Sequence, residues 1–395
     1  MEHNPRVIEL GSLSGAMRAM GDVDPSQADA ADRMYGRVRR AIRIDAVPDD
    51  DAAVLRQEAQ TLGVVVIDGK VRSSGAEPRF LVSDDETLKR LGAGLEAGVL
   101  KSLGAAIRMT LAAYERSAFA IAFADGARMD LTAETRVMGI LNVTPDSFSD
   151  GGALPTPESA VEAASRMADE GADLVDVGGE STRPGAAPVS EDEEIRRVVP
   201  AVQAIKRDLP IRVSVDTSKA KVAKLAIEAG ADLVNDVSAF TDPGMLAALR
   251  STRTPVLIMH RRGTAQTMQR DTAYVDLLSS IVGFLRKRIA AAAAAGISDD
   301  KILVDPGLGF GKSASGNLQV LRELATLRSV GRPIVVGASR KSFIGTALEL
   351  PVAERLEGGL AVAAWAAWQG AHVIRTHDVA ETKRTTRMID AIRRT

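Results

Sequence analysis

From Arg136 onward, short apolar runs alternate with longer stretches in which apolar residues recur at helical spacing. Each run is nearly continuous in apolar residues and is followed by Gly, Asp, Asn or Ser, as is typical of parallel strands buried on both faces. We expect eight such strands: 137–142, 173–177, 212–216, 232–236, 255–260, 302–305, 333–337 and 372–375.

The stretches between these runs predict helices. The first opens with Thr156-Pro157 and ends before Gly171, a sequence that caps a helix at both ends. The expected helices are 156–170, 191–207, 219–228, 243–250, 272–295, 318–327, 353–369 and 378–392. Eight β/α units predict a (β/α)8 TIM barrel. The alternative is an open doubly wound sheet, but polar residues after nearly every strand favour the closed barrel.

The first 134 residues have a different pattern. Strands are expected at 40–45, 64–67, 79–82 and 119–123, and helices at 52–61, 85–97 and 101–116. This order predicts a small α+β layer of the ferredoxin-like kind. We therefore expect two domains: an α+β N-terminal extension at 1–134, of unknown role, and a catalytic barrel at 135–395.

Composition excludes several classes of protein. The 50 Lys and Arg nearly balance the 52 Asp and Glu, and aromatic residues make up only 3%, so no nucleic-acid partner is expected. The absence of cysteine excludes disulfides and thiolate metal sites, and it fits a reducing compartment. The polar start of the chain predicts no secretory signal, and the longest apolar run, 358–371, is too short to span a bilayer. These features predict a cytoplasmic protein without a membrane partner.

Polar side chains follow the predicted strands, where a barrel places its active site. They are Asn142, the run Glu180-Ser181-Thr182-Arg183, Asp216, Asn235, His260, Asp305, Lys341, Arg375 and His377. A single Asp at the end of a strand is more often a helix cap. A whole set of such residues, drawn from distant segments, indicates a site.

The chemistry of this set suggests its ligand. The acceptors of Asp216, Asn235 and Asp305, with the donor Lys341, suit a flat heterocycle carrying amino, N–H and carbonyl groups. Arg375 and His377 suit an anion such as phosphate, and Asn142 offers an oxygen to a hard cation.

Other segments leave alternatives open. The Gly-rich loops 143–154 and 178–188 are either lids over the substrate or ordinary surface loops, and Phe148 favours the lid. His260 is either a ligand contact or a hydrogen-bonded core histidine. The run from Gly307 to Lys312 lacks the spacing of a phosphate loop, so a tight turn is expected. Trp365 and Trp368 indicate core packing or a subunit interface.

Taken together, these segments resemble the dihydropteroate synthases of the pterin-binding barrel family. The two longest matching strings are Met138-Gly-Ile-Leu-Asn-Val-Thr-Pro-Asp-Ser-Phe-Ser-Asp-Gly-Gly152 and Asp176-Val-Gly-Gly-Glu-Ser-Thr-Arg-Pro-Gly185. Shorter ones are Val213-Ser-Val-Asp-Thr-Ser218, Asn235-Asp-Val237, Ile258-Met-His260, Asp305-Pro-Gly-Leu-Gly-Phe-Gly-Lys312, Gly337-Ala-Ser-Arg-Lys-Ser342 and Arg375-Thr-His-Asp378. The resemblance covers about 136–393, and the extension has no counterpart in most of the family.

The resemblance implies a transferase of folate biosynthesis. It would condense 6-hydroxymethyl-7,8-dihydropterin pyrophosphate with p-aminobenzoate, releasing 7,8-dihydropteroate and pyrophosphate through an SN1-like dihydropterin cation with Mg²⁺. It also implies a homodimer and a sulfonamide target. Whether p-aminobenzoate or a related arylamine is the true amine stays open.

The family also implies a role for each matching residue. The pterin site would comprise Asp216, Asn235, Met259, Asp305, Phe310 and Lys341. Pyrophosphate would contact Asn142, Arg375 and His377, with Asn142 as metal ligand. The p-aminobenzoate site would comprise Phe148, Thr182, Arg183, Pro184 and Ser342. Among these, Asp216, Lys341, Arg183, Thr182 and Phe148 would be the catalytic residues.

Two other functions share the barrel. A pterin-dependent methyltransferase would keep the pterin-binding residues but would not need the segments around Arg183 and Ser342. A catalytically silent pterin-binding paralogue would have lost loop residues that are all in place here. Both alternatives are therefore disfavoured for the barrel.

Overall fold

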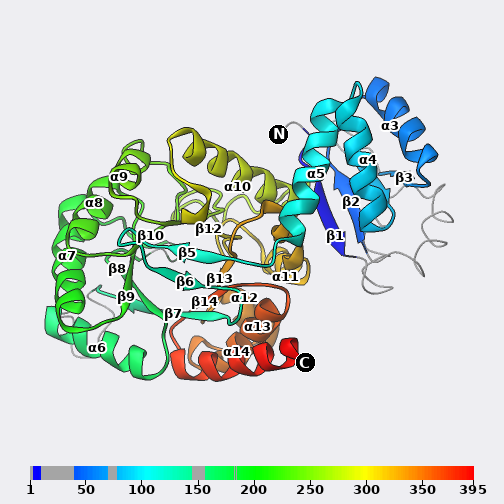
Figure 1. Ribbon diagram of the computed structural model, residues 1–395. Coiled ribbons are helices and arrows are strands. Elements are labelled where there is room, and N and C mark those ends of the chain that lie inside the picture. Colours follow the sequence, from blue (N-terminus) through cyan, green and yellow to red (C-terminus); the bar gives the residue numbers. More distant parts are fainter. Residues whose placement is uncertain (1–2, 10–39, 70–77, 145–155, 182, 184) are drawn as a thin grey trace. The chain divides into compact units, whose positions relative to one another are not determined.

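The computed structural model describes residues 3–9, 40–69, 78–144, 156–181, 183 and 185–395. Its contacts divide the chain into two compact units (Figure 1). Unit 1 contains Met1–Arg116, Tyr274–Arg286 and Glu323–Gly331, and unit 2 contains Ser117–Ala273, Lys287–Arg322 and Arg332–Thr395. The expected domains, 1–134 and 135–395, stay a prediction.

Unit 2 is built on an eight-stranded parallel sheet. The strands are β7 (Arg136–Asn142), β8 (Leu174–Gly178), β9 (Arg212–Asp216), β10 (Leu233–Asp236), β11 (Val256–Met259), β12 (Ile302–Asp305), β13 (Val335–Gly337) and β14 (Val373–Thr376). Their order is β12-β11-β10-β9-β8-β7-β14-β13, and a parallel bridge between Val304 and Ile334 joins the two outer strands. The predicted TIM barrel is confirmed, and every predicted strand lies within two residues of the observed one.

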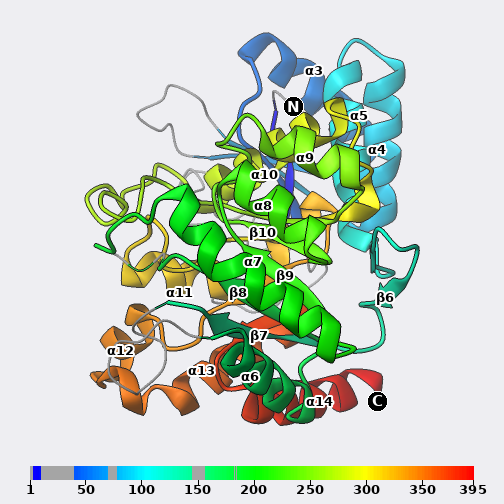
Figure 2. The same ribbon diagram turned by 90° about the vertical axis from the view of Figure 1, so that its left-hand side faces the viewer.

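Helices alternate with the strands around the barrel. They are α6 (Pro157–Asp169), α7 (Glu191–Asp208), α8 (Ala220–Glu228), α9 (Met245–Thr252), α10 (Leu277–Ala294), α11 (Ala314–Arg322), α12 (Ser342–Leu348), α13 (Leu356–Trp368) and α14 (Val379–Arg394). In both views α6, α7 and α8 lie outside β7, β8 and β9 (Figures 1 and 2). The short helix α12 has no predicted counterpart, because its seven residues do not complete an amphipathic repeat.

Two predicted helix boundaries were wrong because capping side chains set the observed ones. Helix α10 begins five residues later than predicted, since Asp276 Oδ1 accepts a hydrogen bond from the N–H of Ser279 at 2.9 Å. The helix predicted at 318–327 is instead α11, opened by Ser313, followed by a separate 3₁₀ segment, Leu324–Val330.

A small hairpin packs against the end of the barrel at which the parallel strands begin, called its lower end below. Strands β5 (Ala120–Ala122) and β6 (Arg128–Asp130) pair only with each other in the described chain. Phe119, Ile121, Phe123 and Leu131 of this segment share one buried cluster with the lower strand residues of the barrel. The assignment of 119–123 to the N-terminal sheet was therefore wrong, because its apolar face is buried by the barrel.

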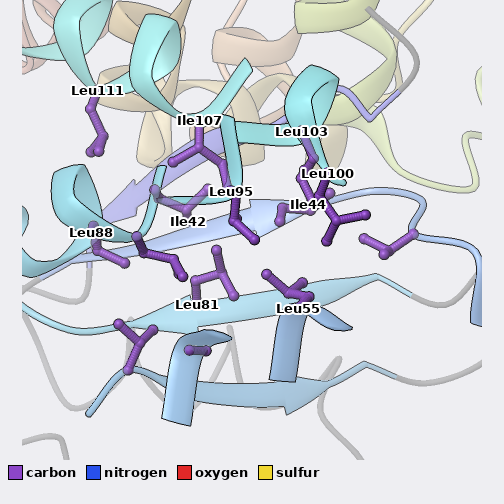
Figure 3. Close-up of a cluster of buried hydrophobic side chains, with 14 of the residues drawn as sticks. Ile42, Ile44, Leu55, Leu81, Leu88, Leu95, Leu100, Leu103, Ile107 and Leu111 are labelled. Carbon is purple, nitrogen blue, oxygen red and sulfur yellow. The ribbon is translucent and has the colours of Figure 1, made fainter. Parts of the chain in front are cut away.

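Unit 1 contains the predicted α+β layer. Its sheet has the antiparallel order β1-β2-β4-β3, formed by Arg6–Glu9, Arg40–Ile44, Arg79–Val82 and Val65–Asp68 in that order. Helices α3 (Asp49–Thr61), α4 (Asp85–Ala97) and α5 (Lys101–Glu115) share one buried cluster with Ile42, Ile44 and Leu81 of the sheet (Figure 3). The strand order is that of a ferredoxin-like layer, but β1 takes the place expected for 119–123.

Polar contacts complete unit 1. Arg6 forms ion pairs with Asp45 at 2.7 Å and with Asp276 at 2.9 Å. Arg286 donates hydrogen bonds to the carbonyl of Pro5 at 2.6 Å and to that of Ser329 at 2.8 Å. Segments far apart in the sequence are thus joined through charged side chains as well as apolar packing.

Candidate active site

The inward-facing strand residues of the barrel form two layers. The lower one is apolar and consists of Met138, Leu174, Leu233, Leu257, Leu303, Val335 and Val373. Because side chains alternate along a strand, the chain faces inward again two residues later. There stand Ile140, Asp176, Asn235, Met259, Asp305, Gly337 and Arg375, and Asp216 joins this layer as the register partner of Asn235 on β9. A mainly polar layer therefore lies directly on an apolar floor, as expected at the carboxyl end of the strands.

A network of charges joins four strands across this layer. Arg375 Nε lies 2.6 Å from Asp176 Oδ2, and Arg375 Nη2 lies 2.8 Å from Asp216 Oδ2. Asn235 Nδ2 donates to the same Asp176 oxygen at 2.9 Å. The guanidinium thus bridges two carboxylates, and three of the predicted site residues meet within one network.

A second group surrounds Asp305. Its Oδ1 accepts from the N–H of Gly307 at 2.6 Å, at the turn predicted after this strand. Lys341 Nζ donates to the carbonyl of Leu308 at 2.5 Å and lies 4.8 Å from the centre of the Phe310 ring. A wall of Val237, Met259, Met268 and Phe310 packs as one apolar cluster. This side of the site therefore combines a carboxylate and an ammonium group with a flat apolar surface.

Burial shifts the ionisation of these groups. It raises the pKa of Asp216 to about 7, against the opposing charge of Arg375 and with a further increase from Asp176. It also raises the pKa of Asp305, which the charge of Lys341 opposes. Burial lowers the pKa of Lys341 to about 8, although Asp305 opposes this shift. A carboxylic acid and an amine that titrate near neutrality are typical of a functional site.

Asn142 and His377 lie at the ends of the neighbouring strands β7 and β14. A Cβ placed on Gly178 would lie 3.7 Å from Asn142 Oδ1 and 3.6 Å from Asp216 Cβ, so these two side chains flank that glycine. His377 Nδ1 lies 3.0 Å from Ser339 Oγ. Burial and the charge of Arg375 lower the pKa of His377 to about 4, so this imidazole is neutral at pH 7.

The loop after β8 is tied down at its base. Glu180 accepts a hydrogen bond from the N–H of Val189 at 3.3 Å and pairs with Lys219 at 2.5 Å. Lys219 also pairs with Glu194, which is 1% exposed. Further along the loop, the N–H of Gly185 donates to the carbonyl of Ala265 at 3.0 Å. The loop is therefore fixed to α7 and to the segment after β11.

The remaining predicted residues fall into three groups. Phe148, Thr182 and Pro184 lie outside the described residues. Arg183 and Ser342 are exposed, on the loop after β8 and at the start of α12. His260 is buried, with Nδ1 3.0 Å from Lys312 Nζ.

Sequence reasoning missed Asp176 and Ser339. Asp176 lies inside the buried strand β8, in a position like that of Asn235 inside β10. The signal was present, because a carboxylate in an otherwise apolar strand needs a partner. Ser339 contacts His377 and precedes Lys341 in the same matching string.

Among the described residues, no group of three or more His, Asp or Glu side chains is placed to hold a metal ion. Nor does any helix in that part of the chain have the length and hydropathy needed to cross a membrane.

Comparison with known proteins agrees with this geometry. The pterin binding enzyme family model matches residues 138–377. The dihydropteroate synthase of Escherichia coli strain K12 is 47% identical over 269 residues, which cover 68% of this chain and 95% of that protein. The Clostridium beijerinckii dihydropteroate synthase is 47% identical over 260 residues, covering 65% of this chain and 94% of that protein.

Solved structures give the same result. A Yersinia pestis dihydropteroate synthase in complex with a sulfonamide drug has a TM-score of 0.66 and 47% identity, covering 68% of this chain and 98% of the other. A Xanthomonas albilineans dihydropteroate synthase with 4-aminobenzoic acid has a TM-score of 0.66 and 42% identity. The match covers 70% of this chain and 99% of the other. The chain belongs to the pterin binding enzyme family, a class of enzymes built on this barrel. Within that family it is a transferase of the dihydropteroate synthase type.

Proposed function

We propose that the chain condenses 6-hydroxymethyl-7,8-dihydropterin pyrophosphate with p-aminobenzoate, giving 7,8-dihydropteroate and pyrophosphate. The observation that carries the proposal is the polar layer in which Asp216, Asn235 and Arg375 form one network, with Asp305 and Lys341 at its side. The names of the relatives support the same reaction. The methyltransferase and silent-paralogue alternatives are not supported by them.

The pterin would lie in the polar layer. Asp305, Asp216 and Asn235 supply acceptors for its amino and N–H groups, and Lys341 supplies a donor for its acceptors. Met259 and Phe310 belong to one apolar cluster that would pack on the flat ring. This division of roles matches polar groups to the edge of the heterocycle and apolar groups to its face.

The chemical step would begin with cleavage of the C–O bond at the exocyclic CH₂ group. The bonding electrons leave with pyrophosphate, and the electron-rich dihydropterin carries the positive charge. Ionised Asp216 favours that cation electrostatically. Arg375 and neutral His377 would contact the departing pyrophosphate. The aniline nitrogen then attacks the CH₂ carbon to form the C–N bond, and its proton passes to the released pyrophosphate.

The amine would approach from the side of the loop after β8. Arg183 of this loop and Ser342 of α12 are both exposed and polar, as a carboxylate-binding group requires. Thr182, Pro184 and Phe148 complete the proposed p-aminobenzoate site. A loop anchored through Glu180 and Lys219 can exclude water, which would otherwise capture the cation.

We also propose that Mg²⁺ is the cofactor, with Asn142 as its protein ligand. An amide oxygen suits this hard cation, and one protein oxygen is enough when phosphate oxygens complete the shell. The described residues fit such a site, since they offer the Asn142 oxygen near Asp216 and no cage of carboxylates. Bound Mg²⁺ would neutralise charge on the pyrophosphate.

A homodimer is proposed from the outer face of α11, α13 and α14. Leu318, Trp365, Trp368, Met388 and Ile392 of these helices are exposed although apolar. Large exposed aromatic side chains are typical of protein interfaces. Sedimentation of the wild type and of Trp368→Glu tests this proposal. A dimeric wild type and a monomeric variant are expected, and a monomeric wild type would contradict it. The cytoplasm stays the proposed location.

The reaction is tested with the purified full-length chain, dihydropterin pyrophosphate, Mg²⁺ and p-aminobenzoate. Amine-dependent release of pyrophosphate is expected, with dihydropteroate identified by mass. Asp305→Asn should abolish most of this activity, whereas Asp299→Asn, an exposed change before the same strand, should not. A sulfonamide that resembles p-aminobenzoate should compete with the amine. Absence of product with any arylamine would overturn the proposal.

A further inference from the structure

Asp176 is the most enclosed charged group of the polar layer. It is 0% exposed and lies in the middle of β8, two residues beyond Leu174 of the apolar floor. Its Oδ2 accepts from both Arg375 Nε and Asn235 Nδ2, at 2.6 and 2.9 Å. We propose that Asp176 is a positioning residue for the pterin site, which acts on the substrate through Arg375 and Asn235. This inference rests on the proposed function.

The contact with Arg375 fixes the plane of the guanidinium. Two adjacent donors of the group are engaged by carboxylates on two neighbouring strands, Asp176 on β8 and Asp216 on β9. A guanidinium held at two points loses most of its rotational freedom. Asp176 thereby determines where Arg375 stands beside Asp216. Without Asp176, Arg375 would keep only one of these two carboxylate partners, Asp216.

The contact with Asn235 fixes the orientation of its amide. An amide can present either its oxygen or its NH₂ group to a ligand, and the surrounding hydrogen bonds decide which. Asp176 accepts only, so it holds the NH₂ group of Asn235 and leaves the amide oxygen for the ligand. A pterin amino or N–H group needs such an acceptor. One carboxylate thus controls both a charge and a hydrogen-bonding direction in the site.

A neighbouring residue provides a matched control. Ser214 on β9 stands in register with Asp176 and is also 0% exposed. Within the part of the chain that the structure describes, its hydroxyl has no hydrogen-bond partner, so it is bonded to neither Arg375 nor Asn235. Ser214→Ala therefore changes the same level of the barrel interior without altering the network.

The test compares Asp176→Asn with Ser214→Ala in the full-length chain. Asparagine preserves the shape of the side chain and removes its charge. Calorimetry with 7,8-dihydropterin lacking the pyrophosphate should show binding about 10–100-fold weaker for Asp176→Asn, as expected for loss of a charged hydrogen bond. The KM for the pterin substrate should rise by a similar factor, and the KM for p-aminobenzoate by less than about threefold. Ser214→Ala should bind like the wild type.

A pH profile separates positioning from general damage. Asp176 raises the pKa of Asp216, as do Glu194 and Asp236, while Arg375 lowers it. Asp176→Asn removes a charge that raises the pKa of Asp216 and frees Arg375, which lowers it. Both effects lower the pKa of Asp216, so the acidic limb of kcat/KM should move to lower pH. Pterin binding equal to wild type, or an unmoved limb, would overturn the inference. A wild type that binds no pterin would instead refute the proposed function.

Discussion

The guanidinium of Arg375 and the carboxylate of Asp216 form an ion pair 2.8 Å long in the polar layer of the barrel. Desolvation still outweighs this pair, because burial keeps the pKa of Asp216 at about 7. A large share of Asp216 is therefore ionised near neutral pH, and this ionisation lowers the stability of the folded protein. The same group that favours a cation in the proposed reaction destabilises the empty site.

We expect a bell-shaped pH dependence of kcat/KM for the pterin substrate. Activity should rise through pH 7 as Asp216 ionises and fall above pH 8 as Lys341, with its pKa lowered to about 8, loses its proton. Asp216→Asn should lower kcat about 100-fold or more and remove the acidic limb. Initial rates between pH 5 and 10 check this expectation. A variant with near-normal turnover would refute the electrostatic role of Asp216.

The same shift predicts an opposite effect on stability. The folded pKa of Asp216 lies above its ordinary value of 3.8, so folding favours the neutral form. The stability that this form provides is complete at low pH and is lost as pH rises through about 7. The loss begins at the ordinary pKa of 3.8, so Asp216→Asn should raise the melting temperature by more at pH 8 than at pH 5. Scanning calorimetry at pH 5 and pH 8 measures these melting temperatures. Equal changes at the two pH values would contradict a raised pKa for Asp216.

Most of the barrel could be predicted from sequence because its strands are continuous apolar runs with polar ends. Asp216, Asn235, Asp305 and Arg375 lie at or near such ends, and topology alone brings them together. The interior position of Asp176 depends on strand register, which the apolar pattern alone does not specify. In the same way, the place of 119–123 in the fold depends on which apolar surface buries it. No local signal in this segment distinguishes the sheet of unit 1 from the barrel.

The ion pairs of Lys219 predict a role for this residue in amine binding. Lys219→Met removes the cation that pairs with Glu180 at the base of the loop and with the buried Glu194. Burial already raises the pKa of Glu194, and the charge of Lys219 opposes that shift. We expect the KM for p-aminobenzoate to rise about tenfold, with a smaller effect on dihydropterin binding.

The neighbouring Lys221 is a suitable control for this change. It pairs with Glu191 and Asp192 of α7, the helix that also carries Glu194, but at an exposed position. Such surface pairs contribute little, so Lys221→Met should keep both KM values. Steady-state kinetics with each substrate varied in turn make the comparison. If Lys219→Met leaves the amine KM unchanged, the loop does not depend on this anchor.

Within unit 1, we expect the hydrogen bonds of Arg286 to hold the N-terminal strand in place. Its guanidinium donates to the carbonyls of Pro5 and Ser329 and to Thr110 Oγ1, at 2.6, 2.8 and 3.0 Å. Arg286→Met removes these donors and leaves the Pro5 carbonyl with the longer hydrogen bond from Thr110 Oγ1, at 3.3 Å; we expect a cost of about 2–4 kcal/mol in the free energy of unfolding. The exposed change Lys287→Met, one residue further along α10, should cost less than about 0.5 kcal/mol. Denaturant unfolding of the full-length chain, followed by hydrogen exchange in 3–9 and 101–115, measures both. Equal stability of the two variants, or exchange that rises only outside these segments, would show that Arg286 does not hold the N-terminal strand.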